Sequence, residues 1–256
     1  MMRLFDTHCH LNDERFSDDW MTLAEELPKK DVELVVNAGC DLESSYFGQM
    51  AASKFNNIYF SAGMHPHDAK DLTEDALSRI IQLCSDKKCV ALGEIGLDYH
   101  YDYSPREVQR DGFARQLDVA KELDIPVIIH EREAWQDTID IMKNYKGLRG
   151  VFHCFSGNRE TAKICLDMGF YISFCGPLTF KNARNPIEVA QYIPRDRALI
   201  ETDSPYMTPE PHRGKRNDPS NVFYIAQKLS LIWGTDIEMV AHQTFMNGCK
   251  LFDIQI

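Results

Sequence analysis

Features that would divide the chain or attach it to a membrane are missing from its 256 residues. There is no low-complexity tract and no linker between two halves, and no apolar run reaches the ~18 residues that a membrane span needs. A strand-like run begins at Leu4, and we expect no signal peptide before it. We therefore expect one domain covering residues 1–256, in the cytoplasm, with no membrane contact and no obligate protein partner.

The chain also lacks any Cys-x-x-Cys pair, although it contains eight cysteines. These residues are scattered, mostly among apolar neighbours, in a chain large enough to fold without covalent cross-links. We expect reduced thiols at Cys9, Cys40, Cys84, Cys89, Cys154, Cys165, Cys175 and Cys249.

Positive charge is scarce. Lysine and arginine number 28 against 39 acidic residues, which gives a net charge of −11. This balance argues against a broad basic surface that coats nucleic acid. A substrate that carries phosphate would need a local positive site, either a metal ion or a short basic loop.

What the sequence does contain is a regular alternation of apolar runs and helical patterns. Strands are predicted at residues 4–8, 32–37, 58–62, 89–92, 126–129, 150–152, 170–173 and 198–200. Helices are predicted at 19–29, 42–55, 73–85, 105–123, 134–145, 159–167, 186–192, 221–233 and 236–252. Before the fourth helix, Ser104 is the predicted N-cap and Pro105 the first helical residue.

Eight strand–helix units in about 250 residues predict an α/β protein with a (β/α)8 barrel, or TIM barrel, fold. The competing architecture, a doubly wound sheet, usually has fewer strands and a glycine-rich phosphate turn after the first one. The turn after residue 8 has no glycine.

Polar side chains with metal-binding chemistry stand where the predicted strands end. They are His8, His10, Glu94, His130, His153 and Asp203. The carboxyl ends of barrel strands meet in one ring, so we expect these residues to converge. Hydrogen bonding in the core is a reasonable explanation for a single histidine there, but six converging polar groups need partners or a cation.

The first strand carries two of these histidines. Strand side chains alternate between faces. We therefore expect Asp6, His8 and His10 to face one way, and Phe5 and Cys9 the other.

Four imidazoles and two carboxylates suit two adjacent divalent cations bridged by a carboxylate. We assign His8, His10 and Asp203 to one cation and His130 and His153 to the other, with Glu94 as the bridge. This ligand chemistry suits Zn, Mn, Fe, Co or Ni and tolerates Mg. We expect a metal-bound hydroxide to be the nucleophile, with Asp203 and Glu94 as catalytic residues and Asp203 as proton acceptor.

Seven segments of the sequence resemble the TatD family of metal-dependent hydrolases, within the amidohydrolase-like barrels. They are residues 5–11, 63–67, 93–99, 129–134, 153–157, 201–206 and 211–217. The resemblance implies a (β/α)8 fold, divalent metals at the six residues above and hydrolysis by a metal-bound water. It also implies deoxyribonuclease activity, which rests on the resemblance alone.

Four further residues are predicted to contact substrate. His65 ends the third strand and could reach a phosphate oxygen, although a rigid turn histidine is an equal alternative. Arg132 could orient a ligand, with a salt bridge at a helix start as the alternative. Arg213 and Arg216 lie in the densest basic run, after the eighth strand, and are predicted to bind phosphate, with a solvated loop as the alternative.

Three tyrosines, Tyr99, Tyr101 and Tyr103, follow the fourth strand. We interpret them as an aromatic cluster packed under a loop, with stacking on a nucleobase as the alternative.

Three functions compete. The first is a phosphodiesterase or deoxyribonuclease, exonuclease-like, acting on single-stranded DNA, DNA ends or nucleotides. The second is an amidohydrolase that cleaves a small amide, ester or lactone with the same two metals, because a metal-bound hydroxide attacks carbon or phosphorus. The third, a binding protein that keeps a metal for stability, is disfavoured by the completeness of the ligand set.

Overall fold

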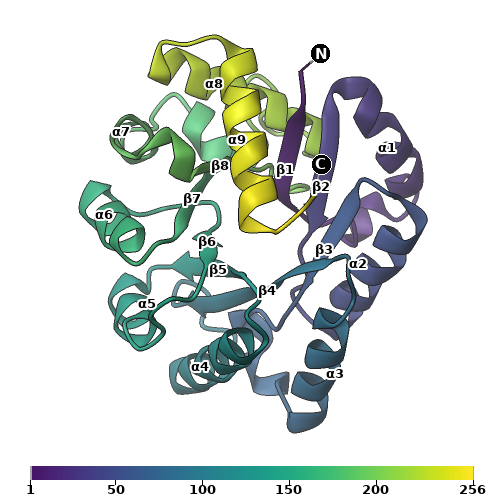
Figure 1. Ribbon diagram of the computed structural model, residues 1–256, viewed down its shortest axis with the longest axis vertical. Helices are drawn as coiled ribbons and strands as arrows, with labels where there is room; N and C mark the ends of the chain where they lie inside the picture. Colours follow the sequence, from purple (N-terminus) through teal and green to yellow (C-terminus); the bar gives the residue numbers. More distant parts are fainter. Residues whose placement is uncertain (1, 256) are drawn as a thin grey trace.

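The computed structural model describes residues 2–255 as a barrel of strands surrounded by helices (Figure 1). All eight strands are parallel, and each pairs with the next one along the chain, in the order β1 to β8. The strands are β1 (Leu4–Cys9), β2 (Val32–Asn37), β3 (Ile58–Ala62), β4 (Cys89–Asp98), β5 (Val127–Arg132), β6 (Gly150–Phe152), β7 (Tyr171–Phe174) and β8 (Ala198–Ile200).

Backbone hydrogen bonds close the barrel between β1 and the segment after β8. The His10 N–H donates to the Ser204 carbonyl at 2.7 Å, and the Asp203 N–H donates to the His8 carbonyl at 2.9 Å. The predicted (β/α)8 fold is confirmed.

Helices follow the strands, as the periodic pattern predicted. They are α1 (Trp20–Glu26), α2 (Leu42–Lys54), α3 (Glu74–Cys84), α4 (Arg106–Leu123), α5 (Trp135–Met142), α6 (Arg159–Asp167), α7 (Asn185–Tyr192), α8 (Val222–Trp233) and α9 (Ile237–Leu251). Short 3-10 helices are η1 (Glu14–Phe16), η2 (Leu27–Lys30), η3 (Pro66–Asp71), η4 (Gly176–Thr179), η5 (Arg195–Arg197) and η6 (Pro219–Asn221). None of the helices within residues 2–255 combines the length and apolarity that crossing a bilayer requires.

Helix α3 illustrates why these segments are helical. Thr73 caps its first turn by accepting a hydrogen bond from the Ala76 N–H at 3.1 Å. Ala76, Ile80 and Leu83 recur at helical spacing and are buried, so one face packs on the barrel.

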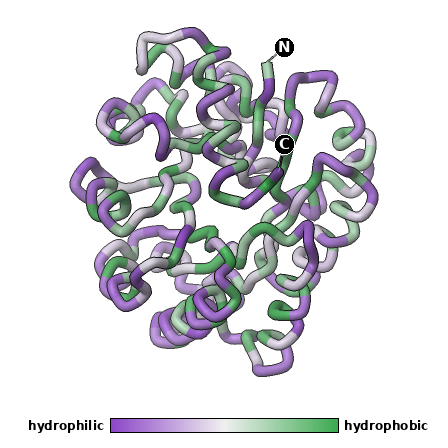
Figure 2. The backbone as a smooth tube through the Cα atoms, viewed as in Figure 1, coloured by the Kyte–Doolittle hydropathy of each residue, from purple (hydrophilic) through white to green (hydrophobic). Residues whose placement is uncertain are grey.

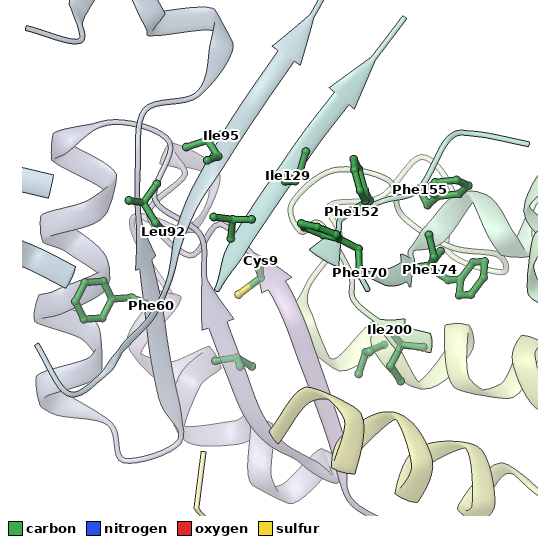
Figure 3. Close-up of a cluster of buried hydrophobic side chains, with 14 of the residues drawn as sticks. Cys9, Phe60, Leu92, Ile95, Ile129, Phe152, Phe155, Phe170, Phe174 and Ile200 are labelled. Atoms are coloured by element: carbon green, nitrogen blue, oxygen red, sulfur yellow. The ribbon is translucent and has the colours of Figure 1, made fainter. Parts of the chain in front are cut away.

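Hydrophobic side chains form two clusters, one on each side of the strand layer. The larger cluster lies between strands and helices, and Figure 3 shows Ile95, Ile129 and Phe152 in it on β4, β5 and β6. Hydrophobic stretches follow the strands, and hydrophilic residues concentrate on the outer helices (Figure 2).

The smaller cluster fills the barrel interior. It joins side chains from strands all round the barrel, including Phe5 and Ile128, to Phe245 of α9. Side chains of opposite strands can meet only inside a closed sheet. Asn247 of α9 also donates to the Ala198 carbonyl at 2.8 Å, so α9 covers the end where the strands begin. The opposite end is left for the site.

Several local predictions are wrong. Strand β4 continues to Asp98 instead of ending at residue 92, and all its residues are buried. Pro105, not Ser104, stands at the N-cap of α4, since the Ser104 hydroxyl accepts a hydrogen bond from the Lys70 N–H at 3.2 Å and donates to the His67 carbonyl at 2.8 Å.

The alternation predicted for the first strand also fails. The pairing of β1 with β2 shifts register between Asp6 and Cys9. Phe5 consequently lies in the inner cluster and Cys9 in the outer one.

Cys154 and Cys175 form a disulfide, with their Cα atoms 5.3 Å apart. This pair departs from the prediction of reduced thiols throughout. The two residues are 21 positions apart in sequence, but they follow β6 and precede η4 after β7, which are neighbouring parallel strands. Sequence spacing alone does not reveal that proximity.

Candidate metal centre

The six predicted ligands converge at the carboxyl ends of the strands. His8, Glu94 and His130 lie in β1, β4 and β5, while His10, His153 and Asp203 follow β1, β6 and β8 directly or within three residues. All are buried except His130, whose side chain is 17% exposed. The barrel therefore brings together residues that are up to 195 positions apart, as the strand-end pattern predicted.

Glu94 lies between the two predicted sets of ligands. Its Oε2 atom is 3.3 Å from His8 Nε2 and 3.7 Å from His10 Nε2. Asp203 completes this first set, with its Oδ1 3.3 Å from His10 Nε2.

The other oxygen of Glu94 faces the second set, His130 and His153. Oε1 lies 2.8 Å from His130 Nδ1 and 2.8 Å from His153 Nε2. The His8 and His153 rings stack with their centroids 4.0 Å apart, so the two sets lie side by side.

The distances between these donor atoms fit metal coordination. Two ligand atoms of one tetrahedral Zn²⁺ lie roughly 3.3 Å apart, since each is about 2.0–2.1 Å from the ion. The Nε2 atoms of His8 and His10 are 3.1 Å apart, and His130 Nδ1 is 3.2 Å from His153 Nε2. Converging nitrogen and oxygen donors without a coordinating thiolate suit the divalent metals named above.

The electrostatics of the site favour cation binding. Burial opposes ionisation of Glu94, but the imidazoles of His153, His65 and His8 hold its pKa well below the usual value. At Asp203, burial is likewise outweighed by His10 and His153, and the pKa is lowered. Two carboxylates are therefore ionised in a buried site.

Two imidazoles at the site, those of the predicted ligand His8 and of the neighbouring His65, have lowered pKa values. Burial, with the neighbouring His130, lowers the pKa of His65 to about 4. Burial and His153 also lower the pKa of His8. A neutral imidazole offers the lone pair that a metal requires.

Two carboxylates that the sequence reasoning missed hold the second set in place. Asp98 Oδ2 lies 3.2 Å from His130 Nε2, and Glu201 Oε1 lies 3.2 Å from His153 Nδ1. Each contact fixes the ring nitrogen that points away from Glu94, as metal-binding histidines usually require. The spacing gave a signal for Asp98, which follows Glu94 by four residues on the same strand.

His67 and Cys40 also belong to the surroundings of the site. His67 Nε2 lies 3.0 Å from Asp98 Oδ2, so Asp98 joins two imidazoles. The Cys40 thiol donates to Glu94 Oε2 at 3.4 Å. Nothing in the sequence around Cys40 indicated this contact.

The predicted substrate residues lie at different places. His65 belongs to the site, with its Nε2 3.5 Å from Glu94 Oε1. Arg132 ends β5 and lies 4.8 Å above the ring of Tyr101. The guanidinium of Arg213 lies 3.9 Å from the centroid of the Phe180 ring.

Arg216 has an acidic partner. It forms two hydrogen bonds with the Asp19 carboxylate, at 2.9 and 2.6 Å. Its positive charge is thus already paired before any substrate binds.

Comparison with known proteins places the chain among metal-dependent hydrolases. Residues 5–253 match the family described as TatD related DNase. A Bacillus subtilis (strain 168) protein, named as the uncharacterized metal-dependent hydrolase YabD, is 44% identical over 253 residues, covering 98% of this chain and 99% of that protein. The 3'-5' ssDNA/RNA exonuclease TatD of Salmonella typhimurium is 30% identical over 261 residues, covering 98% of this chain and 99% of that protein.

Among solved structures, YJJV, a TatD homolog from Escherichia coli K12, is similar with a TM-score of 0.93 and 26% identity, covering 99% of both chains. The family match, the curated relatives and this structure agree over nearly the whole length. Together with the buried histidine and glutamate cluster, they show that the chain belongs to the TatD family of metal-dependent hydrolases.

Proposed function

We propose that this hydrolase is a phosphodiesterase that degrades single-stranded DNA from its ends with two divalent cations. Membership of the TatD family and the 30% identity to a relative named as a 3'-5' ssDNA/RNA exonuclease support the choice of substrate. The ligand geometry supports the number of cations.

The observation that carries the proposal is the position of Glu94 between two ligand sets. Its Oε2 faces His8 and its Oε1 faces His130 and His153, at 3.3, 2.8 and 2.8 Å. Two neighbouring divalent cations would supply an activated water and would neutralise charge on both the attacking and the leaving oxygens of a phosphodiester.

Asp203 and Glu94 take the two catalytic roles. The Asp203 side chain is 12% exposed and ionised, so its carboxylate can meet an incoming water and accept a proton from it. Glu94, with only 3% exposure, is shielded from solvent and holds the two ligand sets at a fixed spacing.

The remaining predicted residues are proposed to bind the substrate. His65 lies beside the second ligand set, and Arg132 lies at the end of the neighbouring strand β5. Arg216 lines a surface pocket of about 410 Å³ together with Lys30 and Lys215. Lysines and arginines gathered in this way give an acidic protein a local site for phosphate.

One observation supports the amidohydrolase alternative. Because Arg216 is paired with Asp19, it brings less net charge to a polyanionic substrate than the basic run suggested. A small, weakly charged amide, ester or lactone would not need that charge.

The test is an activity panel with the purified protein loaded separately with Mn²⁺, Zn²⁺ or Mg²⁺. Single-stranded oligonucleotides labelled at either end are compared with blunt duplexes, esters and lactones. The proposal predicts stepwise shortening of the single strands that a chelator abolishes. Metal-dependent turnover of esters or lactones alone would contradict it.

A further inference from the structure

Tyr101 and Tyr103 form an exposed aromatic pair beside the site. Tyr101 is 45% exposed and Tyr103 is 60% exposed. Their rings stack with centroids 5.2 Å apart and planes 18° from parallel. Tyr99, by contrast, is partly buried, and its hydroxyl donates to Asp137 at 2.6 Å. The predicted packed cluster therefore describes Tyr99 but not the other two.

This pair is connected to the second ligand set through His67. The centroid of the His67 ring lies 4.8 Å from that of Tyr103 and 5.4 Å from that of Tyr101. The same ring lies 6.4 Å from the ring of His130. The His67 ring thus lies between the two tyrosines and the predicted ligand His130.

Arg132 adds a cation to the pair. Its guanidinium lies 4.8 Å from the centroid of the Tyr101 ring. Aromatic faces beside a positive charge are how proteins hold single strands, because every base has a face that can stack and every nucleotide has a phosphate.

We propose that Tyr101 and Tyr103 form a tyrosine platform on which a nucleobase of a single-stranded substrate stacks. The proposal rests on the proposed nuclease function and specifies it further. Tyr103, the more exposed ring, makes the main contact with the base. Arg132 holds the adjoining phosphate, while the phosphodiester to be cleaved lies at the ligand sets around Glu94.

The platform explains a preference for single strands. Bases of a duplex are stacked and paired, so their faces are not available to a protein ring. An unpaired end offers a free face at no unpairing cost. A contact of this kind tolerates any sequence, which suits progressive degradation.

The experiment measures KM and kcat of the metal-loaded enzyme on a single-stranded oligothymidylate. Tyr103→Ala is expected to raise KM by about 5- to 150-fold, the usual effect of losing one stacked base. Tyr103→Phe keeps the ring and should stay close to wild type. Tyr46→Ala removes a tyrosine of comparable exposure, 42%, from the outer helix α2 and serves as the matched control.

A substrate series identifies the base. Single abasic units are placed at successive positions from the end of the oligonucleotide. An abasic unit at one position should weaken binding of the oligonucleotide to the wild type. The same abasic unit should not weaken binding to Tyr103→Ala any further, because the ring on which the base stacks is already gone. Thermal melting of each variant verifies that the fold is intact.

The outcomes are separable. If the wild type cleaves oligonucleotides and Tyr103→Ala keeps the wild-type KM, or if the abasic effect is the same in both, the tyrosine platform is wrong and the nuclease function stands. If the wild type neither binds nor cleaves the oligonucleotide, the proposed function fails and the platform fails with it.

Discussion

Replacing Asp98 by asparagine should weaken the binding of one of the two proposed cations and leave the binding of the other unchanged. Asp98 is buried, and its Oδ2 lies 3.2 Å from His130 Nε2 and 3.0 Å from His67 Nε2. Burial opposes its charge, but hydrogen bonds from His130 and His67 hold its pKa far below the usual value. The carboxylate therefore accepts a hydrogen bond from the Nε2–H of His130. This leaves Nδ1 of His130 unprotonated and free to coordinate a metal ion.

Asparagine has the same shape but puts an NH2 donor in place of the Oδ2 acceptor that faces His130 and His67. The amide oxygen can keep the bonds that Oδ1 accepts from the N–H groups of His100 and Tyr101, at 3.0 and 2.9 Å. The amide nitrogen then points at His130 Nε2 as a donor. The imidazole proton is driven to Nδ1, the nitrogen that faces Glu94.

The expected loss is about 10- to 100-fold in affinity for the second cation, the typical effect of removing a carboxylate behind a histidine ligand. This corresponds to roughly 1.4–2.7 kcal/mol. Affinity for the first cation, held by His8, His10 and Asp203, should change little. Isothermal titration of metal-free protein with Zn²⁺ or Mn²⁺ resolves the two binding events.

Two comparison variants sharpen the measurement. Glu201→Gln should lower the affinity for the same cation, because Glu201 faces His153 Nδ1. Asp140→Asn changes an exposed aspartate on α5 and should bind both cations like the wild type. Two undiminished binding events in Asp98→Asn would refute the assignment of His130 to a cation through Nδ1.

Three further predictions concern turnover, packing and pH. Glu94→Gln should lower kcat by roughly 100-fold or more, because the charge between the ligand sets is lost; an unchanged kcat would argue against the bridge. Gly248→Ala should lower the free energy of unfolding by about 1–3 kcal/mol, since its Cβ would lie 2.6 Å from a ring carbon of Phe5. Gly112→Ala, whose Cβ has no neighbour nearer than 3.4 Å, should be neutral or stabilising in the same urea titration. The hydrogen bond from Arg15 lowers the pKa of Asp13, so ionised Asp13 stabilises the fold above its unfolded pKa of about 3.9 and loses that effect as the pH falls. Asp13→Asn should therefore reduce stability at pH 7 and flatten the acid decline, and identical pH profiles would contradict this.

The barrel was predictable because its signals are local and repeat. Each strand is a short apolar run, and four of the eight predicted ranges (residues 32–37, 58–62, 150–152 and 198–200) match the structure at both ends. The ligand convergence followed from one rule, that the carboxyl ends of barrel strands meet in a ring. Position at a strand end, more than residue type, placed His130 and Asp203 among the predicted ligands.

The misses have long-range causes. The fourth strand was predicted to end at residue 92, but β4 continues to Asp98 because its residues 95–98 pair with residues 129–132 of β5. Ser104 was predicted as a cap from a local motif, yet its hydroxyl bonds to His67 across a loop. The Cys154–Cys175 bond likewise depends on which strands become neighbours.

The residues that hydrogen-bond to the predicted ligands were the hardest to predict. Glu201 gave no local signal and Asp98 only its spacing from Glu94, and it is the fold that turns them toward His153 and His130. Arg216 fits a phosphate-binding run by sequence, but its pairing with Asp19 joins residues 197 positions apart. Charge in a linear motif does not report whether a distant partner neutralises it.

The most direct test of the two-cation centre is a crystal structure of the protein grown with Mn²⁺ or Zn²⁺, with anomalous diffraction collected at the metal edge. Two anomalous peaks are expected beside Glu94. One should be ligated by His8, His10 and Asp203, and the other by His130 and His153. A single peak, or peaks that leave either ligand set without metal at saturating concentration, would contradict it.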